Sequence, residues 1–313
     1  MNEYRGKHSQ SVPWALSSTA SSAHYRSRHL QRNRRRKKWI IVFMVLLIIV
    51  VSFPFLSPLF LQVNRVSLPS EDLPSGIGRM KIVFVSDVHY GFFFSDARVQ
   101  TLVTTINDLK PDLVIFGGDM GDSPDAAVSF YQKLPSIHAR YAALGVLGEA
   151  DHGQTELETS MVTDAMRTAG IIPLVNEIMP VRIGTNVIYV AGLDDMLTGK
   201  PAVSNLASSV SVGDYVIFVS HNPSMIPDSQ RAADASGRLG WYDLALFGHT
   251  HGGQIAGFSW LLDIAGDVPD RYQHGLLEEN RSTLLISNGV GTSVIPVRLF
   301  CPPEIHCIEV SLP

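Results

Sequence analysis

Short runs of apolar, often β-branched residues recur between residues 82 and 286, and each run ends in polar residues. Runs of this length and composition predict buried strands. The seven runs cover residues 82–85, 113–116, 143–147, 187–190, 216–219, 244–247 and 284–286. Apolar residues at helical spacing lie between some of them, over residues 99–109 and 157–169. This alternation predicts an α/β sandwich with parallel and antiparallel strand pairs.

Five of the seven runs are followed at once by side chains that bind metals well. Buried strands of one sheet place their carboxyl ends along one edge, so these side chains are expected to converge there. The candidate metal ligands are Asp87, His89, Asp119, Glu149, His221, His249 and His251.

The spacing of these candidates favours a dinuclear metal centre. Asp87 and His89 are two residues apart, as are His249 and His251, and residues at this spacing in an extended chain point to the same side. Asp119 follows two glycines, where a turn lets its carboxylate reach inward and bridge two ions. Carboxylates and neutral imidazoles suit Mn, Fe or Zn. Two such ions about 3.5–4 Å apart are suited to displacement at phosphorus by an activated water.

Residues 81–310 resemble the calcineurin-like metallophosphoesterases, and within them the membrane-anchored or exported bacterial branch. Four motifs carry the resemblance, and they are Ser-Asp-Val-His (86–89), Gly-Gly-Asp (117–119), Ser-His-Asn-Pro (220–223) and Gly-His-Thr-His-Gly-Gly-Gln (248–254). The resemblance implies a four-layer α/β-β/α metallophosphoesterase sandwich that acts on a phosphorylated substrate. It also implies one metal held by Asp87, His89, Asp119 and His251. The second metal would be held by Asp119, His221, His249 and a residue after the third strand.

The chain departs from the family pattern after the third strand. The family has Gly-Asn-His-(Asp/Glu) there, and this chain has Gly-Glu-Ala-Asp-His over residues 148–152. Glu149 thus stands in the place of an Asn ligand, and Ala150 replaces the His that usually protonates the leaving group. Loss of a general acid costs about 10²- to 10⁴-fold in rate. Either His152 fills the gap, or the substrate has a leaving group that needs no proton.

Two further residues are candidates for contacts to the substrate. Asn222 follows a predicted ligand and is expected either to donate to a phosphate oxygen or to form a turn before Pro223. Arg298 is expected either to bind a phosphate oxygen or to pair with an acid at the surface. The apolar stretch 255–272 suits either a substrate- or membrane-facing lip or ordinary packing against the sheet.

The N-terminal part has a different composition. Residues 1–38 contain ten Lys or Arg and one acid, and residues 39–60 contain no charge at all. This uncharged, mostly apolar run of 22 residues meets the length of about 20 that a bilayer requires. A cleaved signal peptide is the alternative, but no small-x-small cleavage site follows. The positive-inside rule keeps the basic end in the cytoplasm and places the C-terminal body outside it.

The chain is therefore divided into four predicted parts: a disordered cytoplasmic tail (1–38), a transmembrane signal anchor (39–61), a linker (62–80) and a metallophosphoesterase domain (81–313). The parts after residue 38 carry a net charge of about −13, which argues against a nucleic-acid partner. The main hypothesis is a single-pass phosphoesterase of the cell membrane acting on phosphomonoesters, phosphodiesters or pyrophosphates, including lipid-linked phosphates. The alternative, motivated by Ala150, is a catalytically weakened metal-binding membrane module.

Overall fold

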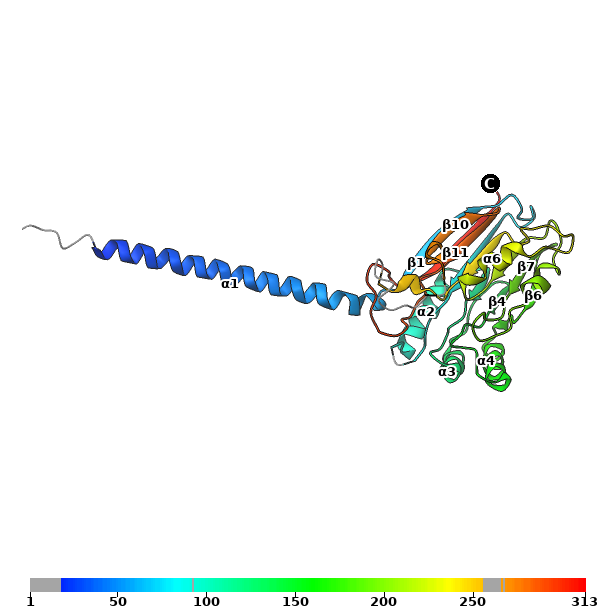
Figure 1. Cartoon of the computed structure of the whole chain (residues 1–313), viewed down its shortest axis with the longest axis horizontal. Coiled ribbons are helices and arrows are strands. Elements are labelled where there is room, and N and C mark those ends of the chain that lie inside the picture. Colours follow the sequence, from blue (N-terminus) through cyan, green and yellow to red (C-terminus); the bar gives the residue numbers. More distant parts are fainter. Residues whose placement is uncertain (1–17, 92, 256–265, 267) are drawn as a thin grey trace, which may run out of the picture. The chain divides into compact units, whose positions relative to one another are not determined.

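The computed structural model describes residues 18–91, 93–255, 266 and 268–313 (Figure 1). The chain forms two compact units, Met1–Ser52 and Phe53–Pro313. The first unit contains most of helix α1 (Ser18–Leu56). Within the described residues, the segment Arg36–Leu59 is long and apolar enough to cross a bilayer by length and composition.

Helix α1 begins earlier than the sequence analysis expects. It includes residues 18–38, which belong to the tail predicted to be disordered, while residues 1–17 lie outside the described residues. Arg and Lys are good helix formers, so the basic segment can continue the apolar helix without interruption.

The second unit contains two six-stranded sheets. The first sheet has the strand order β1-β12-β2-β3-β4-β5 and the second has the order β10-β11-β9-β8-β7-β6. The strands of the first sheet are β1 (Gln62–Pro69), β12 (Glu304–Ser311), β2 (Arg79–Val85), β3 (Leu113–Phe116), β4 (Ala142–Gly145) and β5 (Ile172–Pro173). Those of the second are β10 (Gly275–Glu279), β11 (Ser282–Ile286), β9 (Leu244–Phe247), β8 (Val216–Val219), β7 (Asn186–Gly192) and β6 (Glu177–Ile183). The neighbours β2, β3, β4 and β5 are parallel, as are β7, β8, β9 and β11.

The part predicted as a linker contains a strand of the sheet. Strand β1 pairs in parallel with β12 along its whole length, from Gln62 opposite Glu304 to Pro69 opposite Ser311. Five of its eight residues are exposed, because it lies at the edge of the sheet. The expected linker 62–80 is thus shortened to the residues between β1 and β2.

Successive side chains of a strand point to opposite faces of its sheet, so the buried residues form three clusters. One face of the first sheet packs against α2 (Asp96–Asp108), α3 (Pro124–Lys133) and α4 (Glu156–Thr168). Its other face packs against the second sheet, with residues such as Phe84 and Ile217 meeting between them. The outer face of the second sheet packs against α5 (Val203–Ala207) and α6 (Ile226–Arg231). The helix–sheet–sheet–helix order confirms the predicted four-layer sandwich.

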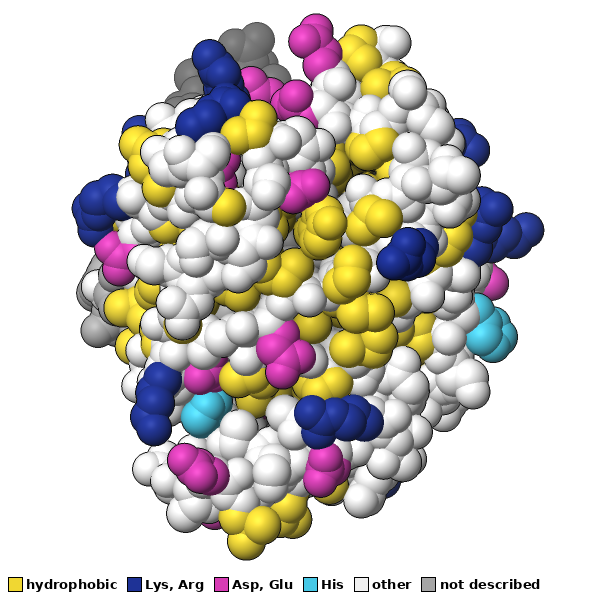
Figure 2. Space-filling view, turned by 90° about the vertical axis from the view of Figure 1, so that its right-hand side faces the viewer, with side chains coloured by type: hydrophobic (Ala, Val, Ile, Leu, Met, Phe, Trp, Pro, Cys, Tyr) yellow, Lys and Arg dark blue, Asp and Glu magenta, His cyan; other side chains and the backbone are white. Residues whose placement is uncertain are grey.

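The charged side chains on one face of the second unit are dispersed. On the face shown in Figure 2, Lys and Arg side chains lie singly among acidic and apolar ones.

Candidate metal centre

The loops that follow the parallel strands hold their polar residues in strained backbone conformations. Five of the seven candidate ligands have a positive φ: Asp87 (54°), His89 (48°), Asp119 (56°), His249 (69°) and His251 (52°). A non-glycine residue in such a region costs about 1–3 kcal/mol, and such residues cluster at functional sites. The strain therefore marks one edge of the two sheets as the candidate site.

Hydrogen bonds fix these loops to one another within the first sheet and join them to the second sheet. Asp87 N donates to Gly118 O (3.0 Å) and His89 N donates to Asp119 O (3.0 Å). The second sheet joins through His221, whose Nδ1 lies 2.8 Å from Gly117 O. This contact leaves Nε2 of His221 directed at the carboxylates.

Two groups of buried side chains bring their ligand atoms within 4.8 Å of one another. They are Asp87, His89 and His251, and Asp87, Asp119 and His221. Nε2 of His89 lies 3.0 Å from Nε2 of His251, which lies 3.7 Å from Asp87 Oδ1. Ligand atoms that share one ion at about 2.0–2.2 Å are separated by similar distances. Among the described residues, Asp87 Oδ2 and His221 Nε2 are buried without a hydrogen-bond partner, as expected for atoms facing a cation.

Asp119 belongs to the second group and also approaches His89 of the first group. Its Oδ2 is 3.6 Å from His89 Nε2 and 3.3 Å from His221 Nε2, and its Oδ1 accepts from Ala150 N at 2.9 Å. Burial alone would raise the pKa of Asp119, but His221 and His89 outweigh it and hold the pKa well below the usual range. The carboxylate is therefore charged, and one of its oxygens faces imidazoles from both sheets.

The protonation of His251 also suits a metal ligand. Burial, followed by the nearby His89 and Arg298, lowers its pKa well below the ordinary value. A neutral imidazole has a lone pair available for a metal.

Glu149 is placed beside the second group. Its Oε2 lies 3.5 Å from His249 Nδ1, and its side chain is 37% exposed. Burial, helped by Asp119, raises the pKa of Glu149, while His249 opposes this effect. Neither Glu149 nor His249 belongs to the two tight groups, so the structure brings them near the centre but less closely than the other candidates.

His152 does not fill the gap left by Ala150, where it was one candidate for the general acid, and its ring contacts other residues. Its Nε2 lies 3.3 Å from Asp194 Oδ1, and its Nδ1 lies 3.4 Å from Thr159 Oγ1. Neither partner is a candidate ligand. The ring lines a cavity of about 460 Å³ together with residues of α4 and the Asp194–Lys200 loop. The side chain of Ala150, a methyl group, supplies no proton in its place.

Arg298 is fully buried, which differs from the expected surface ion pair. Its guanidinium donates to the carbonyls of Gly291 (2.7 Å), Asn288 (2.7 Å) and Cys301 (3.2 Å). It also lies 3.2 Å from His251 Nδ1. A guanidinium has five N–H donors, so these contacts use most of them and hold the last long loop against a candidate ligand.

Asn222 adopts the turn role. It is buried, and its Oδ1 accepts from Ser224 N at 2.8 Å, which caps the short helix Pro223–Met225. The apolar stretch 255–272 lies largely outside the described residues, which resume at residue 266 and continuously from residue 268.

Two acidic residues near the centre escaped the sequence analysis. Asp151 is buried and accepts from the backbone N–H groups of Met120 (2.8 Å) and Gly121 (3.1 Å), which ties the Asp119 loop to the Glu149 loop. Asp195 is buried, and its charge raises the pKa of Glu149. Asp151 could have been recognised as part of the site from the sequence, because it occupies the Asp/Glu position of the family motif. For Asp195, the only sequence signal was its position after a predicted strand.

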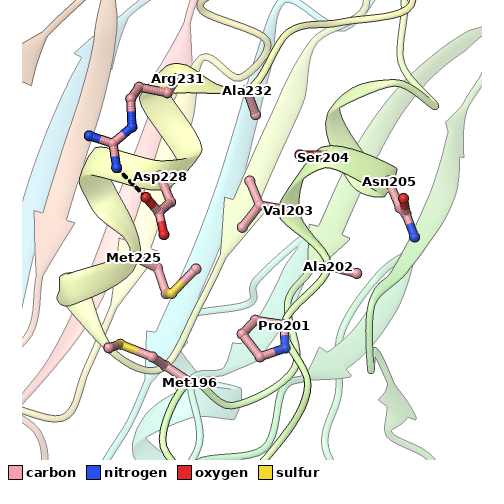
Figure 3. A pocket seen from close by; sticks show the side chains of 10 residues that line it. All are labelled: Met196, Pro201, Ala202, Val203, Ser204, Asn205, Met225, Asp228, Arg231 and Ala232. Atoms are coloured by element: carbon pink, nitrogen blue, oxygen red, sulfur yellow. Dashed lines mark hydrogen bonds and ion pairs between the residues drawn. The ribbon is translucent and has the colours of Figure 1, made fainter.

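A second cavity, of about 540 Å³, lies between α5 and α6 and is shown in Figure 3. The ion pair of Asp228 and Arg231 lines it together with Asn205, and its other lining side chains are small or apolar. None of the candidate ligands lines it, so it is separate from the metal centre.

Comparisons with known proteins agree with this geometry. The profile described as calcineurin-like phosphoesterase matches residues 80–253. The chain is 28% identical over 257 residues to the uncharacterized metallophosphoesterase YkuE of Bacillus subtilis, covering 80% of this chain and 86% of YkuE. It is 26% identical over 238 residues to the phosphodiesterase YaeI of Escherichia coli, covering 73% and 81%.

A transmembrane protein with metallophosphoesterase domain from Danio rerio is 26% identical over 258 residues, covering 78% of this chain and 56% of that protein. Among solved structures, phosphopantetheinyl hydrolase of Mycobacterium tuberculosis aligns with a TM-score of 0.43 and 10% identity over 71% of this chain and 96% of its own. The profile match covers more than half of the sequence. This chain thus belongs to the calcineurin-like phosphoesterase family, whose members are metal-dependent phosphoester hydrolases.

Proposed function

We propose that the chain is a membrane-anchored hydrolase of phosphate esters with two divalent ions, Mn, Fe or Zn, at the edge of its sheets. The first ion would be held by Asp87, His89, Asp119 and His251, and the second by Asp119, His221, His249 and Glu149. The observation that carries this proposal is the position of Asp119. One of its carboxylate oxygens faces His89 of the first sheet and His221 of the second within 3.6 Å.

Bound divalent ions supply a water of lowered pKa and offset negative charge on the phosphate. The chain's own residues set the geometry for this chemistry. The strained loops hold the imidazoles and carboxylates in fixed positions before the substrate arrives, which avoids the cost of ordering them. Asp151 and Arg298 lie behind these loops and hold the ligand-bearing turns together.

The lack of a proton donor at position 150 narrows the range of leaving groups that the proposed hydrolase can release efficiently. Ala150 has no acidic proton, and His152 is directed to Asp194. A leaving group that departs as a stable anion needs no proton, so nucleotide diphosphates, aryl esters and other esters of acidic alcohols are favoured over simple alkyl monoesters. Glu149 adds a negative charge where the family has a neutral Asn, which repels any anionic substrate slightly more.

The membrane location rests on helix α1. Its apolar part can cross a bilayer, and the basic residues before it favour a cytoplasmic N-terminus with the hydrolase outside the cytoplasm. A hydrolase fixed to a membrane meets phosphates carried by lipids at high local concentration, so lipid-linked phosphates and pyrophosphates belong to the proposed substrates. A reporter fused after Pro313 tests the topology, since activity of a cytoplasmic reporter would contradict it.

The catalytic proposal is tested with the full-length chain in nanodiscs. Hydrolysis of an aryl phosphomonoester and an aryl phosphodiester is measured with added Mn²⁺, and metal content is measured in parallel. Activity that disappears in Asp119→Asn, together with loss of both bound ions, is the expected result. Two ions that remain bound in Asp119→Asn would contradict the bridging position.

The same experiment separates the alternative function, a metal-binding membrane module that Ala150 motivates. That alternative predicts two bound Mn²⁺ without hydrolysis of either ester. Hydrolysis that is absent in the parent chain but present in Ala150→His would identify an intact centre that lacks only its acid.

A further inference from the structure

The end of the apolar helix is hydrogen-bonded to helix α2 and to the loop between β11 and β12. Pro54 O, in the last turns of α1, accepts from Arg298 N at 3.0 Å. Pro58 O accepts from Arg98 Nη2 at 2.7 Å, and both Ser57 and Pro58 are buried. These contacts lie within the second compact unit, which begins at Phe53. They fix where the chain enters the folded domain.

Arg98 connects this entry point to the loop after β2. Its Nη1 donates to Phe93 O at 3.0 Å, and its guanidinium lies 4.1 Å from the centre of the Phe94 ring. The loop after β2 therefore lies next to residues 57–60. Phe93 in this loop is 42% exposed, and Leu59 and Phe60 are 59% and 65% exposed.

The loop between β11 and β12 supplies a second group of exposed apolar residues. Val294 is 69% exposed and Phe300 is 78% exposed. Both have a positive φ, of 41° and 55°, which is rare for bulky and β-branched residues. Neither side chain is buried in the fold, so packing within the domain does not offset the free-energy cost of the strained backbone at these two residues.

This loop is held firmly. Nε2 of Gln254, directly after the last histidine motif, donates to Ile295 O and Val297 O at 3.3 Å. Oε1 of Gln254 accepts from Ser293 N. Gln254 is itself fully buried. The loop is therefore a fixed support that presents Val294 and Phe300 outward.

We propose that Phe93, Val294 and Phe300, together with Leu59 and Phe60, form a membrane-contact surface that inserts into the interfacial region of the bilayer. The bilayer is the occupant because the surface includes Leu59, the last residue of the apolar segment Arg36–Leu59. Pro54 and Pro58 of that segment are hydrogen-bonded to Arg298 and Arg98 of the domain. Apolar and aromatic side chains at such a position gain free energy by entering the boundary between headgroups and acyl chains.

The surface has a consequence for the catalytic site. Phe93 lies four residues after the candidate ligand His89, and Phe300 lies two residues after Arg298, which contacts His251. The loops that would touch the bilayer are thus the loops that carry or support the metal ligands. This arrangement brings the centre close to phosphate esters held in the membrane.

The test is depth-dependent quenching in the full-length chain. Phe93→Cys, Val294→Cys and Phe300→Cys are each labelled with bimane and reconstituted in nanodiscs with plain or acyl-brominated lipids. Leu47→Cys, within the apolar segment, is the positive control. Leu157→Cys and Val212→Cys, 70% and 54% exposed on other elements, are the negative controls. The parent chain, whose two cysteines are buried, gives the labelling background.

Brominated lipids are expected to quench the three test positions by about half, as for side chains at the acyl boundary, and to leave the two negative controls unchanged. Quenching of the test positions equal to that of Leu157→Cys would overturn the proposal, and a dimer detected at the same time would assign the surface to a second copy. The measurement needs neither substrate nor added metal. The surface can therefore fail while the proposed hydrolase stands, and the reverse also holds.

Discussion

Substitution of Arg298 by Met tests whether this buried guanidinium holds the metal-centre loops together. Met has a similar length and no donors, so it leaves the carbonyls of the buried Gly291 and Cys301 and of the half-buried Asn288 without their partner. A buried acceptor left unsatisfied costs about 1–3 kcal/mol. The substitution also removes the desolvation cost of the buried guanidinium, and this gain offsets part of the loss in stability. We expect Arg298→Met to lower the free energy of unfolding by about 3–6 kcal/mol.

The assay is urea unfolding of the full-length chain in detergent, followed by tryptophan fluorescence and extrapolated to water. Arg140→Met is the matched control, because Arg140 is 72% exposed and its ion pair with Asp112 is 3.7 Å long. Such surface pairs contribute about 0–1 kcal/mol. A loss in Arg298→Met within 1 kcal/mol of the control would refute the reasoning, since it would mean that water or a rearranged loop replaces the guanidinium at little cost.

Three other substitutions have defined outcomes. Ala150→His should raise hydrolysis of an alkyl phosphomonoester about 10²-fold or more while changing that of an aryl ester less, and equal changes in both would exclude a missing acid. Burial raises the pKa of Asp243 to about 7, so the folded chain holds a proton that the unfolded chain releases near pH 4. Stability should therefore fall as pH rises from about 4 to 7, and Asp243→Asn should flatten this dependence of the urea midpoint. Thr155→Ala removes the capping box of α4 and should cost about 1 kcal/mol, whereas Thr104→Ala, in the exposed middle of α2, should cost much less.

The sandwich was predictable from the sequence because its buried parallel strands are continuous apolar runs. The run at 216–219 matches β8, and the run at 244–247 matches β9. Strand β1 was missed because it is mostly exposed and has no continuous apolar run, and its partner β12 lies more than 200 residues away in the sequence.

The candidate site was predictable in part, for a similar reason. Asp87 and His221 follow their strands directly, so the sheet edge alone brings them together. The surroundings of Arg298 and His152 depend on which distant loops fold over them, and no local pattern encodes that. Burial of Arg298 in particular results from carbonyls of a loop that has no regular structure.

The short connection between α1 and β1 limits how far the hydrolase domain can lie from the membrane. Residues 57–61 alone connect the end of α1 to the start of β1, and they span at most about 20 Å even when extended. With the apolar segment Arg36–Leu59 in the bilayer, this short length of chain keeps the hydrolase near the membrane surface, where it searches a thin layer in two dimensions. Its turnover should then depend on the surface density of substrate in the membrane and respond weakly to the bulk concentration of soluble esters.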